Sequence, residues 1–98
     1  MEKFDDIIKS EKPVLVDFFA TWCGPCQMMH PILEELHGMV EGKARIIKID
    51  IDKNQELAAK YNVRSVPTLM VFKNGEVQWR QAGVQQADTL LQVINQFA

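Results

Sequence analysis

The sequence predicts an α/β fold in which a mixed central sheet of about four strands has helices on both faces. The apolar stretches Val14–Phe19 and Ile46–Ile51 flank a segment whose apolar residues have helical spacing, a pattern typical of a parallel βαβ unit. Further along, two strand-like stretches are joined through Asn74-Gly75, the strongest short signal for an antiparallel hairpin. A sheet that combines both units contains parallel and antiparallel neighbours.

The first half of the chain begins with a short amphipathic helix containing Phe4, Ile7 and Ile8. The strand Val14–Phe19 is apolar on both faces except at Asp17, as expected for a central strand. The following helix ends near Gly38 or Gly42, and Pro31 should kink it. Its apolar face is formed by Met29, Ile32, Leu33, Leu36 and Val40.

The second half starts with the strand Ile46–Ile51 and a short helix over Asn54–Tyr61, with Asp52 or Asn54 as its N-cap. Two strands of the hairpin and a last helix complete the fold. The strands are Thr68–Phe72 and Val77–Gln81, and the helix carries Leu90, Leu91, Ile94 and Phe97.

Composition predicts a single domain that spans residues 1–98. The chain is 47% hydrophobic and has a formal net charge of −2, which suits one globular core. Without a basic run, neither nucleic acid nor an anionic membrane is an expected partner. The charged N-terminal segment lacks the apolar stretch of a secretory signal, and no stretch approaches the ~18 apolar residues of a membrane span. We therefore expect a cytoplasmic protein.

The only two cysteines lie in Trp22-Cys23-Gly24-Pro25-Cys26, where a strand gives way to a helix. Cysteines three apart on a first helical turn have Cβ atoms roughly 5–6 Å apart, so a disulfide can open and close between them. The helix N-terminus favours a thiolate at Cys23. We expect Cys23 to be the nucleophile and Cys26 the resolving thiol. A purely structural disulfide would stabilise the fold by only ~2 kcal/mol, because the loop is short.

Asp17 is the most informative polar residue outside this motif. An ionised carboxylate in an apolar strand is costly, so its pKa should be raised unless a partner compensates. A raised pKa suits proton exchange. The alternative is an aspartate at the strand end that reaches solvent or a backbone N–H.

A metal site is a competing hypothesis, because Cys23, Cys26, His30 and His37 resemble a zinc-ligand string. The two histidines are separated by a helical rise of ~10.5 Å, too far for one zinc ion with bonds of ~2.0–2.3 Å. We therefore expect surface histidines and no metal, although two cysteines with one histidine remain an alternative. A non-enzymatic interaction module is a further alternative.

The combination of the dithiol motif, Asp17, Val66-Pro67-Thr68 before the hairpin and Gly83 after it closely resembles the thioredoxin family from Phe4 to Phe97. The resemblance implies a thioredoxin fold and a thiol-disulfide oxidoreductase. Its members serve as protein-disulfide reductases and electron donors in cell redox homeostasis. It also implies that Pro67 is a cis proline facing the dithiol.

The resemblance further implies roles for individual residues. Asp17 takes or delivers the proton of Cys26, and Lys48 in the neighbouring strand tunes that carboxylate; a solvated strand lysine is the alternative reading. The backbone of Val66 should pair with an extended substrate segment. The expected substrate-binding surface consists of Trp22, Gly24, Pro25, Val66, Pro67, Gly83 and Val84.

Departures from the family pattern concern its first strand and three side chains. Family members usually begin with an extra strand, so we expect an open sheet edge at Ala44–Asp50, blunted by Arg45 and Lys48. The changed side chains are Phe19 in place of a common tryptophan, Gln27 in place of a frequent basic residue, and Ser65 in place of a frequent glycine.

Gly24-Pro25 between the cysteines is the pair found in reducing members, whereas oxidising relatives commonly carry a histidine there. A disulfide oxidase or isomerase of the same fold is therefore the alternative direction of reaction. The resemblance implies no bound cofactor. It implies electrons from NADPH through a flavin-containing thioredoxin reductase, disulfide-containing protein substrates and a monomer.

Overall fold

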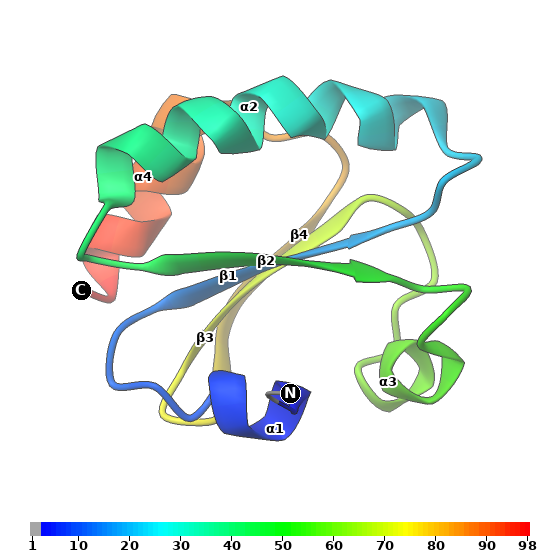
Figure 1. The fold of residues 1–98 in the computed structure, drawn as a ribbon, viewed down its shortest axis with the longest axis horizontal. Helices are drawn as coiled ribbons and strands as arrows, with labels where there is room; N and C mark the ends of the chain where they lie inside the picture. Colours follow the sequence, from blue (N-terminus) through cyan, green and yellow to red (C-terminus); the bar gives the residue numbers. More distant parts are fainter. Residues whose placement is uncertain (1–2) are drawn as a thin grey trace.

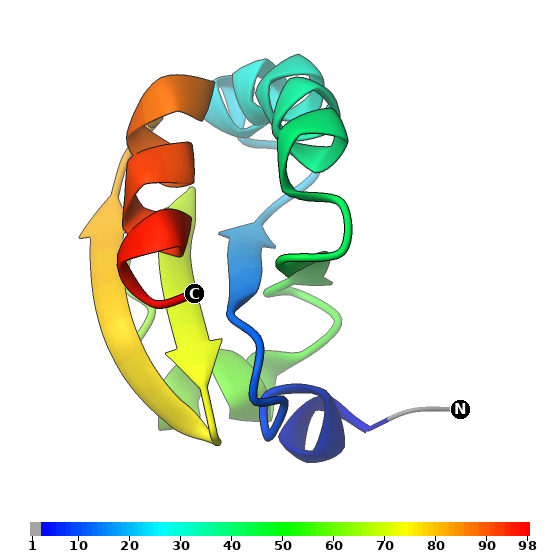
Figure 2. The same cartoon turned by 90° about the vertical axis from the view of Figure 1, so that its left-hand side faces the viewer.

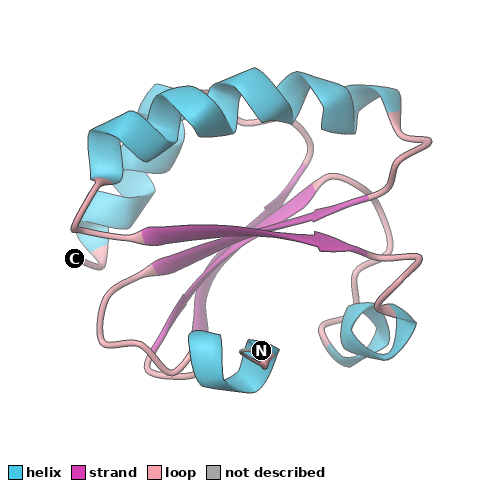
Figure 3. Ribbon diagram, in the orientation of Figure 1, coloured by secondary structure: helices cyan, strands magenta, loops and turns pink. Residues whose placement is uncertain are grey.

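A computed structural model describes residues 3–98 as four strands and four helices (Figures 1 and 3). The order confirms each element that the sequence predicts; β1 has the predicted bounds, and the other boundaries differ by one to a few residues. The elements are α1 (Phe4–Ile7), β1 (Val14–Phe19), α2 (Gly24–Val40), β2 (Arg45–Asp50), α3 (Gln55–Lys60), β3 (Thr68–Lys73), β4 (Glu76–Ala82) and α4 (Ala87–Gln96).

The strands form one mixed sheet in the order β2-β1-β3-β4. β1 runs parallel to β2 and antiparallel to β3, and β3 pairs antiparallel with β4. β1 is buried along nearly its whole length, as its apolar sequence predicts. β2 lies at the edge of the sheet and is only half-buried, because it has a neighbouring strand on one side.

Two helices cover each face of the sheet. α2 and α4 lie on one face, and α1 and α3 lie on the other (Figure 1). In the perpendicular view, α2 lies toward β1 and β2 while α4 lies toward β3 and β4 (Figure 2). The result is a three-layer α/β arrangement, which confirms the predicted fold class.

Each face has its own apolar core. Leu15, Leu69 and Val71 of the sheet pack with α2 and α4 on one side. The opposite core contains a group of aromatic rings whose centroids lie 5.2–6.4 Å apart, an edge-to-face spacing that stabilises packing beyond area burial. These rings belong to Phe4, Phe18, Tyr61 and Phe72. Both cores anchor β1, the strand that leads to the dithiol.

The β3–β4 turn has the conformation that Asn-Gly predicts. Asn74 and Gly75 have φ angles of 54° and 84°, as a tight hairpin turn requires. Their N–H groups donate to the carbonyl oxygens of Ser10 and Ile8, at 2.9 and 2.8 Å. The turn therefore ties the hairpin to the segment that follows α1.

α2 is one helix from Gly24 to Val40 with the exposed Pro31 inside it, and the kink expected there stays a prediction. The expected cap of α3 needs revision. Asn54 is at the N-cap of α3 but makes no side-chain capping bond, and its amide instead donates to the Asp50 carbonyl oxygen at 3.0 Å. No helix within residues 3–98 is long and apolar enough to cross a membrane.

Candidate active site

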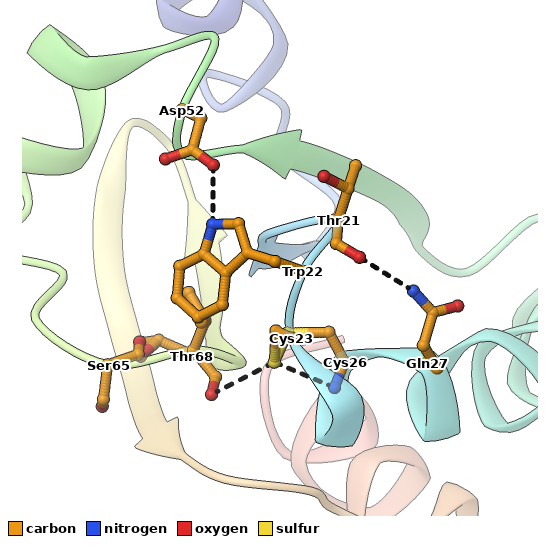
Figure 4. The surroundings of a disulfide bond; sticks show 9 residues. Thr21, Trp22, Cys23, Cys26, Gln27, Asp52, Ser65 and Thr68 are labelled. Carbon is orange, nitrogen blue, oxygen red and sulfur yellow. Dashed lines mark hydrogen bonds between the residues drawn. A yellow bond between two sulfur atoms is a disulfide. The ribbon is translucent and has the colours of Figure 1, made fainter.

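The two cysteines lie at the start of α2, directly after the loop that follows β1. Cys23 is the N-cap residue, Gly24 and Pro25 form the first two helical positions, and Cys26 completes the turn. A disulfide joins the cysteines, whose Cα atoms are 5.3 Å apart. Cys26 N–H also donates to Cys23 Sγ at 3.1 Å (Figure 4). Cys23 Sγ therefore takes the place of a capping oxygen, where the helix dipole favours negative charge.

The loop before β3 lies against this sulfur. The Val66–Pro67 peptide bond is cis, as the resemblance implies, and the Val66 carbonyl oxygen lies 3.6 Å from Cys23 Sγ. The Pro67 carbonyl oxygen in turn accepts a hydrogen bond from Gly83 N–H at 2.8 Å. Gly83 has a φ of +91°, a backbone conformation that favours glycine. The loops before β3 and after β4 are thus joined beside the dithiol.

Trp22 stands out from this surface, with 69% of its area exposed. Its indole Nε1–H donates to Asp52 Oδ2 at 2.8 Å (Figure 4), which fixes the orientation of an otherwise free ring. The sequence suggested Asp52 only as a helix cap, so its contact with Trp22 was missed. The predicted parallel pairing of β1 and β2 could have indicated this contact, because the loops after both strands lie at the same edge of the sheet.

The other expected surface residues differ in exposure. Gly24 and Pro25 are exposed, Val66 is half-buried and Pro67 is buried. Val84 is half-buried and packs against the core beneath α2 and α4. The structure therefore brings Trp22, the cysteine turn and the cis-proline loop together, while Val84 contributes only in part to the surface.

Asp17 is fully buried in the middle of β1, on the face that α2 covers. Neither carboxyl oxygen has a hydrogen-bond partner among residues 3–98. Burial raises the pKa of Asp17 from 3.8 to about 6, and the positive charge of Lys48 partly offsets this rise. The alternative of a solvent-reaching strand-end aspartate is wrong for this residue.

Lys48 is the direct neighbour of Asp17 in the β1–β2 register. Its side chain is exposed, and its ammonium contacts Nδ1 of His30. His30 is half-buried, with its ring edge-to-face against Phe19 at a centroid distance of 6.4 Å. Both histidines reach the surface, as expected: His30 is half-buried and His37 is exposed. No group of three or more His, Cys, Asp or Glu residues that could hold a metal ion occurs within residues 3–98.

The three departures from the family pattern have small local roles. Gln27 donates its amide to the Thr21 carbonyl oxygen at 3.4 Å (Figure 4). The Ser65 carbonyl oxygen accepts a hydrogen bond from the Thr68 hydroxyl at 2.6 Å. Phe19 packs beside the cysteine turn. None of them displaces a cysteine or the buried carboxyl group.

A cysteine pair that closes into a disulfide on the first turn of a helix, at the end of a central strand, defines a thiol-disulfide oxidoreductase. The thioredoxin family model matches residues 1–96. A thioredoxin from Staphylococcus saprophyticus is 54% identical over 91 residues, which is 93% of this chain and 86% of the relative. A thioredoxin from Rickettsia bellii is 46% identical, with 93% and 87% coverage.

A solved structure agrees with these relatives. A mutant thioredoxin from Halobacterium salinarum superposes with a TM-score of 0.86 at 44% sequence identity, covering 95% of this chain and 80% of that one. The chain belongs to the thioredoxin family. It is a thiol-disulfide oxidoreductase.

Proposed function

We propose that the protein reduces disulfide bonds in other proteins and that Cys23 makes the first attack. The observation that carries the proposal is the position of Cys23 Sγ at the N-cap of α2, beside Cys26 N–H. Unpaired N–H groups and the helix dipole stabilise a thiolate at that position, and the thiolate is the nucleophile in disulfide exchange.

The reaction has two exchange steps. Cys23 thiolate attacks one sulfur of the substrate disulfide, forming a mixed disulfide and releasing the other sulfur as a thiolate. Cys26, once deprotonated, then attacks Cys23 Sγ and releases the second substrate thiolate. The substrate gains two electrons, and the protein is left with the Cys23–Cys26 disulfide.

Asp17 is the proposed acceptor for the Cys26 proton. Burial holds its pKa at about 6, so at neutral pH it is a stronger base than an ordinary aspartate. Lys48, its neighbour in the register, limits how far that pKa rises. The pair thus sets the basicity available to the resolving step.

The proposed substrate site surrounds the Cys23 sulfur. Trp22 and the exposed Gly24-Pro25 turn form one side, and Val66, Pro67, Gly83 and Val84 form the other. The Val66 carbonyl beside Cys23 Sγ gives an extended substrate segment a backbone group to pair with. Backbone pairing tolerates many sequences, which suits a reductase with several protein substrates.

The electron route and compartment are also proposals. Something must reduce the Cys23–Cys26 disulfide after each cycle, and we infer NADPH through a flavin-containing thioredoxin reductase, with the protein acting as a cytoplasmic monomer. Gly24-Pro25 favours reduction over oxidation, because histidine at such a position stabilises the reduced form and makes a dithiol more oxidising.

A trapping experiment tests the proposal. Cys26→Ser should form a covalent complex with a disulfide-containing protein through Cys23. Dithiothreitol should reduce this mixed disulfide and separate the two proteins. The matched control, Cys23→Ser, should form none. Equal trapping by both variants would contradict the assigned roles, and partners retained by the double serine variant would favour the interaction module.

A further inference from the structure

His30 lies where the buried carboxyl group, the edge strand and the reactive helix meet. It follows Cys26 by four residues on α2, which places both side chains on the same side of the helix. Its ring packs on Phe19 of β1, and Nδ1 contacts the ammonium of Lys48 on β2. His30 therefore contacts Lys48, whose positive charge lowers the pKa of the Asp17 carboxyl group.

An ammonium group has only donors, so an imidazole accepts a hydrogen bond from it at Nδ1 only in the neutral form, with the proton on Nε2. A protonated imidazole donates from both nitrogens and carries a positive charge. It therefore cannot hold the ammonium, and the two cations repel one another.

The Lys48 ammonium makes no hydrogen bond to Asp17. Lys48 is its register neighbour, and the positive charge does reach it, because Lys48 lowers the pKa that burial raises. Nevertheless, both carboxyl oxygens lack a hydrogen-bond partner among residues 3–98. One ammonium thus has two candidate acceptors, a histidine nitrogen and a buried carboxylate.

We propose that His30 is a positioning residue that competes with Asp17 for the Lys48 ammonium, so that protonation of His30 releases Lys48 toward the carboxylate. The consequence for catalysis rests on the proposed role of Asp17 as the base for Cys26. While His30 is neutral, the pKa of Asp17 stays raised. When His30 is protonated, the released Lys48 ammonium lowers that pKa and makes the carboxylate a weaker base.

The other charged groups near His30 are few. A shallow groove of about 230 Å³ between α2 and β2 is lined by His30, Leu33, Glu34, His37, Ile46 and Lys48. Glu34 and His37 are exposed in this groove, so water screens their charges. The next charged residue along β2, Asp50, accepts hydrogen bonds from the N–H groups of Asp52 and Lys53. Within residues 3–98, the titratable groups that contact His30 or line this groove with it are Lys48 from β2 and Glu34 and His37 from α2. Asp17 of β1 is the register neighbour of Lys48.

The test is an NMR titration of the Asp17 carboxyl carbon in the oxidised protein, in which neither cysteine titrates. His30→Leu keeps an apolar cover but offers no acceptor, and it should lower the pKa of Asp17 by about one unit, the effect of an opposite charge nearby. His30→Gln keeps a neutral acceptor that cannot be protonated, so its Asp17 pKa should stay above that of His30→Leu. The control His37→Leu removes the other groove histidine and should leave Asp17 unchanged.

Repeating the substitution in a Lys48→Met variant distinguishes competition for the ammonium from a pKa change caused by water entering the site. In Lys48→Met, there is no ammonium to release, so adding His30→Leu should not change the Asp17 titration. An equal decrease of the pKa in both backgrounds would overturn the proposal, as would no change or an increase in His30→Leu alone.

The pH dependence supplies a further readout. In the wild type, His30 and Asp17 share one ammonium, so the Asp17 curve should depart from that of a single proton, whereas His30→Gln should give a single-proton curve. Superimposable Asp17 titration curves for the wild type and His30→Gln would contradict the proposed competition. These measurements involve no thiol reaction, so failure of the trapping experiment with Cys26→Ser would reject the reductase mechanism without affecting them.

Discussion

The substitution Asp17→Asn turns the burial of this carboxyl group into a measurable free energy. In the unfolded chain Asp17 loses its proton near its ordinary pKa of 3.8, whereas the folded protein holds it until about pH 6. Between these values the folded state binds more protons, so the free energy of unfolding falls as the pH rises. The shift corresponds to about 3 kcal/mol. The stability that protonated Asp17 contributes to the folded state is present below pH 4 and is lost above about pH 6.

Asparagine is neutral at every pH and therefore avoids this loss. The oxidised Asp17→Asn variant should exceed the wild type in stability by about 3 kcal/mol at pH 7–8 and by much less at pH 4. Guanidinium denaturation of both oxidised proteins across this range measures the difference. Glu35→Gln removes an exposed carboxylate from α2 and, as a control, should change stability by less than about 0.5 kcal/mol. A difference that does not vary with pH, or a less stable asparagine variant at pH 7, would refute the reasoning.

Two further substitutions test the loops around the dithiol. Gly83→Ala should destabilise the protein by about 1–2 kcal/mol in thermal denaturation, because its φ of +91° strains any side chain; an added Cβ meets no atom within 4 Å, so a much larger loss would contradict the backbone explanation. Asp52→Ala should cost about 1 kcal/mol or less in stability and should alter Trp22 fluorescence, since the indole loses its acceptor. An unchanged spectrum would show that Asp52 does not hold the ring.

The sequence predicts most of the fold because its strongest signals are local. Asn74-Gly75 specifies a turn by its own backbone preferences, and the apolar stretch at β1 predicts a buried strand wherever it lies. The position of Cys23 at a helix N-terminus is equally local. Each of these features depends on residues that are close in the sequence, so pattern and spacing suffice.

The contacts missing from the prediction are those between elements. The Trp22–Asp52 hydrogen bond and the His30–Lys48 contact both join residues separated by 30 and 18 positions. They depend on the register of β1 with β2 and on where α2 crosses the sheet, which no local pattern specifies. The burial of Asp17, by contrast, was predictable, since its strand is apolar on both faces.

The reduction potential of the Cys23/Cys26 couple, measured against a redox buffer, tests the proposed direction of electron flow. Reference values are about −270 mV for thioredoxins and about −180 mV for a protein disulfide isomerase, a gap of roughly 4 kcal/mol for two electrons. A reductase requires a value near −270 mV. A value near −180 mV would contradict it and would make the protein an oxidase or isomerase.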